Sequence, residues 1–201
     1  MTYREGPSQP FRVHQDFLCY YSPYFEAVFK GKFAESKSGA LDLEDVSPKV
    51  FEIFVNWLYT QTVFLPGSKL PQIQDLMNLW IFADRLLIPR LQNHTLEAID
   101  RVRLKSKTFP SSVFHHVYEY TDKGSPLRRY IVDVMSRGKA NPLQYPERFP
   151  VELLVDIINV MRMRVEVGVI KFSEHDLKGY HVSEDVPSRD RKPGVEFEYS
   201  K

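Results

Sequence analysis

The stretch from Phe11 to Phe64, FRVHQDFLCYYSPYFEAVFKGKFAESKSGALDLEDVSPKVFEIFVNWLYTQTVF, decides the fold of this chain. Short pieces in which apolar and polar residues alternate are typical of half-buried strands. Longer pieces with an apolar residue every three or four positions are typical of amphipathic helices. The stretch has no Gly-rich phosphate loop. It therefore predicts a compact scaffold of helices and short strands that presents an exposed face to another protein.

Three Ser-Pro pairs mark the starts of helices, at Ser22-Pro23, Ser47-Pro48 and Ser125-Pro126. Proline disrupts a helix interior but suits the first turn, and serine accepts a hydrogen bond from a backbone N–H group that the helix leaves free. We therefore expect one short helix to end near Tyr20 and the next to begin at once at Pro23. Further helices are expected from about Pro71, from Pro89, over Ser112–Tyr120, from Pro126 and from about Pro150.

Strands are expected where short segments alternate or are rich in β-branched and aromatic residues. The segment Val165–Phe172 is apolar and β-branched, which leaves open a late strand or an extension of the preceding helix. From Ser173 onward charged residues, Gly and Pro dominate, so we expect little fixed structure there. The three expected strands are Phe11–Val13, Leu41–Leu43 and Thr60–Phe64.

The fold class that follows is α+β, with a helix-dominated core, a small sheet and a C-terminal helical extension. A polar segment beyond Lys105 suggests a joint between the core and this extension. We divide the chain into a flexible leader at residues 1–10, a main domain at 11–105, the extension at 106–165 and a mostly irregular or flexible tail at 166–201.

Composition excludes several classes of protein. The 201 residues are 43% hydrophobic and 13% aromatic, enough for the core of one domain or of two small ones. A net charge of +1 gives no global field toward nucleic acid or an acidic membrane. The single Cys19 excludes an internal disulfide and fits a reducing compartment. Because there is no apolar signal segment and no run of about eighteen apolar residues, we expect an intracellular protein, in the cytoplasm, the nucleus or both, without membrane contact.

A series of short motifs follows in a recognisable order from residue 11 to about residue 104, and their order and spacing resemble the BTB/POZ family, within it the fungal BTB proteins. Residues 109–164 are similar, more loosely, to the helical extension common in the fungal group. The motifs are Phe11-Arg12-Val13-His14, Leu18, Ser22-Pro23-Tyr24-Phe25, Phe29, Phe33-Ala34-Glu35-Ser36, Leu41-Asp42-Leu43, Phe51, Phe54, Trp57-Leu58-Tyr59-Thr60 and LWIFADRLLIPRL at 79–91.

The resemblance implies a module for protein–protein interaction. BTB domains often form dimers, and many bind a cullin scaffold and so bring substrates to a ubiquitin ligase. The cullin-binding members carry a hydrophobic–any–Glu motif after their third helix, and Phe33, Ala34 and Glu35 stand at the matching place. An apolar ring in a partner's pocket, beside a carboxylate that accepts a hydrogen bond, is a contact of this kind. The other interpretation is that Phe33 packs on its own domain and Glu35 is a solvated turn residue.

The chain departs from the family at its start. The family usually begins with a strand and a helix ahead of the segment that matches Phe11, and both contribute to the dimer interface. Only ten residues precede Phe11 here. We therefore expect the first strand to be missing, and we leave formation of a homodimer open.

No pattern in the sequence predicts a catalytic residue, a cofactor or a metal site. His14 is expected to pack and to form hydrogen bonds at a strand–helix corner, and Cys19 is expected to be an inert thiol. The adjacent His115-His116 would point about 100° apart on a helix, so they cannot chelate a metal together. Basic groups such as Arg128-Arg129 lack interleaved aromatic residues, so nucleic acid is not an expected partner.

The sequence thus predicts a non-enzymatic interaction module of BTB/POZ type that serves as a substrate adaptor for a cullin-based ubiquitin ligase. Its partners would be a cullin and a substrate protein, and Phe33, Ala34 and Glu35 would contact the partner. The alternative is a dimerisation or scaffold module, including a transcription-associated one, with no cullin link. An enzyme with an unrecognised site is a remote third interpretation.

Overall fold

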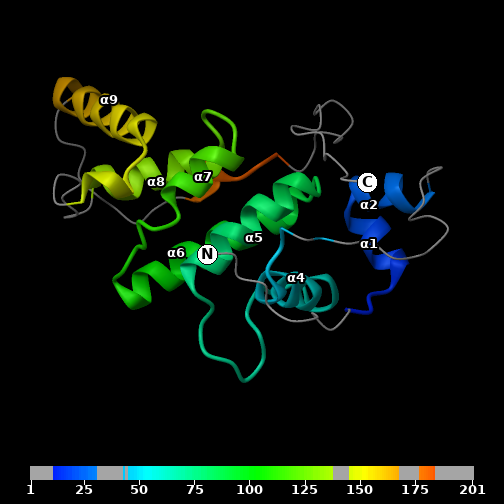
Figure 1. Cartoon of the computed structure of the whole chain (residues 1–201). Helices are drawn as coiled ribbons and strands as arrows, with labels where there is room; N and C mark the ends of the chain where they lie inside the picture. Colours follow the sequence, from blue (N-terminus) through cyan, green and yellow to red (C-terminus); the bar gives the residue numbers. More distant parts are fainter. Residues whose placement is uncertain (1–10, 31–42, 44, 138–144, 168–176, 184–201) are drawn as a thin grey trace.

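The structure, a computed structural model, describes residues 11–30, 43, 45–137, 145–167 and 177–183, without the side chains of residues 164–167 and 178 (Figure 1). The described part is built from helices. They are α1 (Gln15–Tyr21), α2 (Pro23–Lys30), α4 (Pro48–Thr60), α5 (Ile73–Arg85), α6 (Pro89–Ser106), α7 (Phe114–Tyr120), α8 (Pro126–Arg137), α9 (Val151–Val167) and the short 3₁₀ helices η2 (Pro146–Arg148) and η3 (Leu177–Tyr180).

Each Ser-Pro pair begins a helix, as predicted. The Ser47 hydroxyl accepts a hydrogen bond from the Val50 N–H (3.3 Å), with Pro48 as the first residue of α4. The Ser125 hydroxyl accepts one from the Arg128 N–H (3.4 Å) at the start of α8. In both cases the side chain satisfies a backbone donor that the helix leaves free. The cap at Ser22 also joins two parts of the molecule and is described with the site below.

The α5–α6 pair forms the centre of the molecule. Trp80 on α5 and Leu91 on α6 are buried, as is Trp57 on the neighbouring α4. The Trp57 indole N–H donates to His94 Nδ1 on α6 (2.8 Å), so the buried indole has the polar partner that it requires. The turn between α5 and α6 places Leu87 at a positive φ of 57°, and the Ile88 N–H closes it by donating to the Ala83 carbonyl (2.9 Å).

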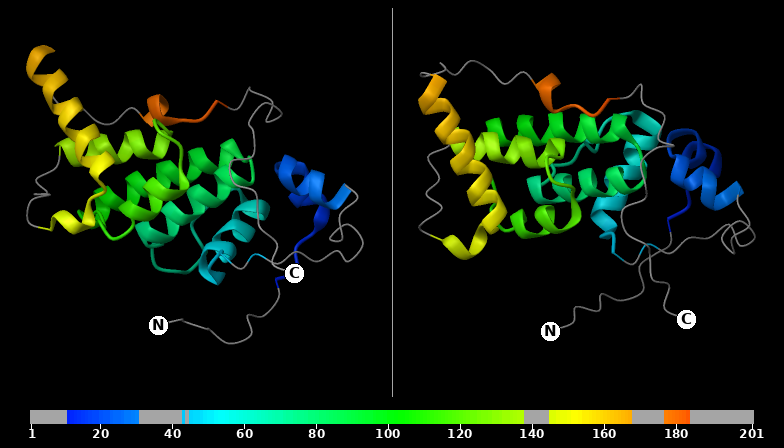
Figure 2. Two further views of the ribbon diagram at one scale, coloured as in Figure 1. Left: turned by 45° about the horizontal axis from the view of Figure 1, so that its top comes forward. Right: turned by 90° about the horizontal axis from the view of Figure 1, so that it is seen from above.

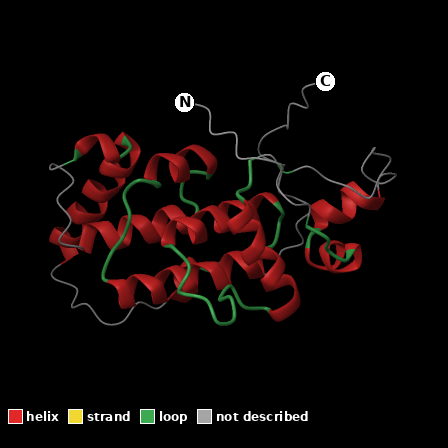
Figure 3. Ribbon diagram, turned by 60° about the horizontal axis from the view of Figure 1, so that its bottom comes forward, coloured by secondary structure: helices red, strands yellow, loops and turns green. Residues whose placement is uncertain are grey.

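The predicted small sheet is not confirmed, because no strand occurs in the part of the chain that the structure describes (Figure 3). Phe11–Val13 has no strand partner there, and the segment after Thr60 bends. Its backbone groups bond to nearby side chains instead: the Asn56 amide donates to the Thr62 carbonyl (2.7 Å), and the Phe64 N–H donates to the Thr62 hydroxyl (3.2 Å). Such local bonds compete with strand pairing. Of the remaining expected strand, Leu41–Leu43, residues 41 and 42 lie outside the described residues.

The helices α7, α8 and α9 pack on the same core as the helices before them. A single cluster of buried apolar side chains runs from Leu18 on α1 to Val182 near the end of the described chain, and it includes Phe114 on α7 and Leu153 on α9. The helix α9 continues to Val167, so the first part of the segment left open above is helical. The α1–α2 pair and α9 lie at opposite ends of the molecule (Figure 2).

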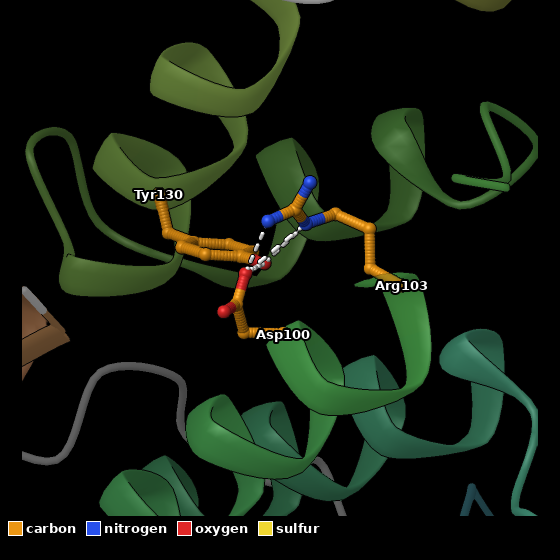
Figure 4. A network of polar contacts seen from close by, with 3 residues as sticks. All are labelled: Asp100, Arg103 and Tyr130. Atoms are coloured by element: carbon orange, nitrogen blue, oxygen red, sulfur yellow. Dashed lines mark hydrogen bonds and ion pairs between the residues drawn. The ribbon is translucent and has the colours of Figure 1, made fainter. Parts of the chain in front are cut away.

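A buried polar network joins the main domain to the extension (Figure 4). The Tyr130 hydroxyl on α8 donates to Asp100 Oδ1 on α6 (2.7 Å) and accepts from Arg103 Nε (3.1 Å). Arg103 also donates to Asp100 Oδ1 through Nη2 (2.6 Å). Burial, and then the hydrogen bond to Asp100, raise the pKa of Tyr130 far above its ordinary range. The network fixes the register between α6 and α8.

Candidate protein-interaction surface

The predicted partner-binding residues Phe33, Ala34 and Glu35 lie outside the described residues, so their role stays a prediction. They follow α2 directly in the sequence. At the end of α2, Lys30 Nζ donates to Glu26 Oε1 (3.0 Å), and this bond raises the pKa of Lys30. We therefore describe the candidate surface from the helices around this segment.

Three aromatic side chains form an exposed cluster where α1 meets α4, which we call the aromatic face: His14, Phe17 and Tyr59. The rings of Phe17 on α1 and Tyr59 on α4 lie 4.9 Å apart between centroids, and His14 lies 5.9 Å from Tyr59. Phe17 is 40% exposed and Tyr59 is 42% exposed. Rings of this size, held together at the surface, are typical of protein interfaces.

Hydrogen bonds hold the aromatic face in one arrangement. The Tyr59 hydroxyl accepts from the His14 backbone N–H (3.1 Å) and bonds to His14 Nδ1 (2.7 Å). With the neutral imidazole protonated at Nε2, the hydroxyl donates to Nδ1 and both groups are satisfied. This agrees with the expected hydrogen-bonding role of His14. Because the hydroxyl is engaged within the protein, a partner would meet mainly the faces and edges of the rings.

The α1–α2 pair, in which α1 supplies Phe17 of the aromatic face, is anchored to the core through Ser22. This fully buried hydroxyl donates to the Leu86 carbonyl at the end of α5 (2.7 Å) and accepts from the Phe25 N–H (3.2 Å). One side chain thus begins α2 and fixes it to the core. The Tyr21 ring also packs edge to face on Trp57, with centroids 5.1 Å apart. A partner would therefore meet a preorganised surface.

Phe17 lies within the short helix that the sequence predicts to end near Tyr20, but that prediction does not separate exposed from buried positions. A signal was present: Phe17 and Leu18 are adjacent, so on a helix they point about 100° apart and one face cannot bury both fully. The structure buries Leu18 and exposes Phe17. Tyr59 lay within a recognised motif, but nothing in the sequence showed that its ring reaches Phe17.

The candidate metal-binding and nucleophilic side chains of the described ranges lie apart from one another. No group of three or more His, Cys, Asp or Glu residues in the described ranges could hold a metal ion. Burial raises the pKa of the Cys19 thiol, which lowers the fraction of reactive thiolate. His115 and His116 take separate partners, the Glu147 carbonyl and the Tyr120 ring. Across the described ranges, no helix is long and apolar enough to cross a membrane.

A second exposed surface lies on α9. Its apolar members, spaced by four and three residues, share one side of the helix. They are between 48% and 71% exposed, in contrast to Leu153 and Ile157, which face the core. We call this surface the α9 stripe; its members are Val151, Val155, Ile158 and Met161.

Comparison with known proteins gives consistent matches to one family. The profile of the BTB/POZ domain matches residues 4–102, about half of the chain. A segment of 47 residues is 47% identical to Kelch-like protein 30 of Homo sapiens and covers 23% of this chain and 8% of that protein. Over 70 residues the chain is 33% identical to Kelch-like protein 40 of Xenopus laevis, covering 35% of this chain and 11% of the relative.

The name of a third relative includes a zinc finger beside the BTB domain. Over 68 residues the chain is 32% identical to zinc finger and BTB domain-containing protein 21 of Homo sapiens, covering 34% of this chain and 6% of the relative. This chain thus matches only a small part of each of these relatives. No solved structure is significantly similar to it. The family match and the helical fold lead to one assignment: residues 4–102 form a BTB/POZ domain, a module for protein–protein interaction, and further helices pack onto it.

Proposed function

We propose that this chain is an adaptor that binds a cullin scaffold through its BTB/POZ domain and brings a substrate protein to a ubiquitin ligase. The observation that carries the proposal is the preorganised aromatic face of His14, Phe17 and Tyr59. Phe17 lies on α1, which directly precedes α2, and Phe33-Ala34-Glu35 begins three residues after α2 ends at Lys30. In the proposed complex Phe33, Ala34 and Glu35 contact the cullin together with the aromatic face.

The physical argument is that of an interface hot spot. Exposed rings that are already fixed lose little conformational freedom on binding, so more of the burial energy appears as affinity. A Phe ring with a Glu carboxylate two residues later adds an apolar anchor and a charge-assisted hydrogen bond. The similarity to Kelch-like proteins supports a BTB/POZ interaction module of this kind.

The test is direct binding of the purified full chain to the N-terminal region of a cullin, measured by calorimetry. The double substitution Phe33→Ala and Glu35→Ala is expected to raise the Kd about a hundredfold, as for two side chains that each contribute about 1.4 kcal/mol. Phe17→Ala is expected to raise it about tenfold.

A matched control is Tyr145→Ala, which removes an equally exposed aromatic ring at a distance from the aromatic face. It should leave the Kd unchanged. Unchanged cullin binding by the double variant would show that Phe33 and Glu35 are not the contact. An effect of the double variant without any effect of Phe17→Ala would separate the aromatic face from the cullin site.

The second candidate function is a dimerisation or scaffold module with no cullin link, transcription-associated or otherwise. The α9 stripe favours it, because an exposed apolar helix face of this length is a site where a second protein can bind. The fungal-type organisation and the division at residues 105 and 165 remain part of the proposal.

A further inference from the structure

Residues 177–183, which we call the returning segment, pass over α6 and α8 at the end of the described chain (Figure 2). Their backbone is held by a side chain. Asn93 Nδ2 on α6 donates to the Val182 carbonyl (3.1 Å), and the Val182 N–H donates to Asn93 Oδ1 (2.7 Å). This is the two-bond pattern that opposite residues make between antiparallel strands. It fixes the position of an extended peptide without regard to the peptide's side chains.

Two side chains of the returning segment occupy defined places. Val182 is 6% exposed and belongs to the hydrophobic core. The Tyr180 ring packs edge to face on Tyr130 of α8, with centroids 5.8 Å apart, and the Arg129 guanidinium lies 6.0 Å from its centre. Leu177 packs partly on the same core. The segment is thus recognised in the pattern Leu-x-x-Tyr-x-Val.

A polar contact lies between these two anchors. His181 Nε2 is 3.4 Å from Glu97 Oε1 on α6, so an acidic side chain faces the residue that separates Tyr180 from Val182. A small or basic residue fits this position, whereas an acidic one would face Glu97 with like charge.

The composition of α6 fits a peptide-binding role. Asn93 is 5% exposed and lies on a helix that buries apolar residues such as Leu96 and Ile99 together with the polar residues Gln92, Thr95 and Asp100. A buried amide is costly without hydrogen bonds and is a poor helix former, so packing of α6 alone does not account for it. The bonds to the Val182 backbone do account for it.

We propose that the surface formed by Asn93, Glu97, Arg129 and Tyr130 is a docking site for an extended peptide of the pattern Leu-x-x-Tyr-x-Val, and that the returning segment occupies it as a built-in competitor. A partner protein that carries this pattern binds the chain by displacing residues 177–183. Since the competitor is covalently attached, it acts at an effective concentration on the order of millimolar. The site is separate from the aromatic face and does not depend on cullin binding.

The first experiment measures fluorescence anisotropy of a labelled peptide, HDLKGYHVSE, which copies residues 175–184. The proteins are the full chain and a full-length release variant with Tyr180→Ala and Val182→Asp. The release variant is expected to bind the peptide at least a hundredfold more tightly than the wild-type chain. Adding Asn93→Leu, which keeps the side-chain shape but removes the amide, should weaken that binding at least tenfold. A peptide of scrambled sequence is the control.

The second experiment uses the wild-type chain and does not depend on a variant that folds. Hydrogen exchange of the Val182 amide is slowed by its bond to Asn93, and a millimolar excess of the peptide is expected to accelerate it while the amides within α6 keep their rates. Two results would overturn the proposal: equal peptide binding with and without Asn93, or no binding to the release variant together with unchanged Val182 exchange.

Discussion

The hydroxyl of Tyr59 joins a residue ahead of α1 to the end of α4, across 45 positions of the sequence. It bonds to both the backbone and the ring of His14. A phenylalanine at this position would keep the ring contact with Phe17 and lose both hydrogen bonds. Comparison of tyrosine with phenylalanine at position 59 therefore distinguishes the effect of the ring contact from the effect of the two hydrogen bonds.

Tyr59→Phe is expected to lower the free energy of unfolding by about 1 kcal/mol, the usual net contribution of such bonds. Urea denaturation at neutral pH measures it. Tyr20→Phe is the matched control, since the Tyr20 ring is far more exposed and its hydroxyl makes no hydrogen bond to the described residues. Equal stability of the Tyr59→Phe variant and the wild-type chain would mean that the His14 bonds do not hold the face in solution.

Some single-residue features could be predicted from the sequence and others could not. The role of the three serines followed from local chemistry, because a cap needs only the next three residues. The exposure of Phe17 and its contact with Tyr59 depend on how α1 meets α4, and no local pattern contains that information. The same holds for Asn93, whose partner Val182 lies 89 positions away.

At the scale of elements, helices could be predicted and strands could not. Helix boundaries near Pro23, Pro48, Pro89 and Pro126 are set by residues within one turn. A strand requires a partner, and the segment after Thr60 bonds to Asn56 and to its own side chains instead. Alternation of apolar and polar residues over four or five positions therefore does not decide between a strand and an irregular segment.

The contact between α6 and α8 should make the stability of the protein depend on pH in the alkaline range. The pKa of Tyr130 is raised in the folded state by burial and by Asp100. Above about pH 10 the unfolded chain releases this proton while the folded chain keeps it, so stability falls as the pH rises. The contribution of one such group is about 1.4 kcal/mol per pH unit.

Tyr130→Phe removes this contribution. The variant is expected to be less stable at neutral pH, because Asp100 and Arg103 lose a partner, yet its stability should decline less steeply between pH 10 and 11. Urea denaturation across this range gives both slopes, and their difference isolates Tyr130 from other groups that titrate there. Parallel slopes would show that Tyr130 is not buried in its neutral form.

For the whole molecule, helix α1, which carries Phe17, and helix α9 lie at opposite ends (Figure 2). Helix α9 carries acidic Glu152 near its start and basic Arg162 near its end. When two copies of α9 lie antiparallel, the acidic end of each meets the basic end of the other, with Val155 and Ile158 at the centre. The scaffold alternative therefore corresponds to a symmetric dimer of this geometry.

Under that alternative, sedimentation of the full wild-type chain shows a dimer, and Ile158→Glu converts it to a monomer by placing like charges at the centre. Met163→Glu is the control, because Met163 is exposed on α9 but lies about 140° around the helix from Ile158. The α9 dimer would be excluded if the wild-type chain remained monomeric over a 100-fold range of protein concentration that reaches the solubility limit.

The network of Asp100, Arg103 and Tyr130 has a practical consequence for dividing the protein. The family boundary at residue 102 falls inside α6, between Asp100 and Arg103. A fragment that ended there would separate the carboxylate from both of its partners and would strip α7 and α8 from the core. The smallest piece worth expressing, crystallising or fusing to a reporter therefore extends at least through α8 to Arg137, well past the domain boundary that family comparison draws.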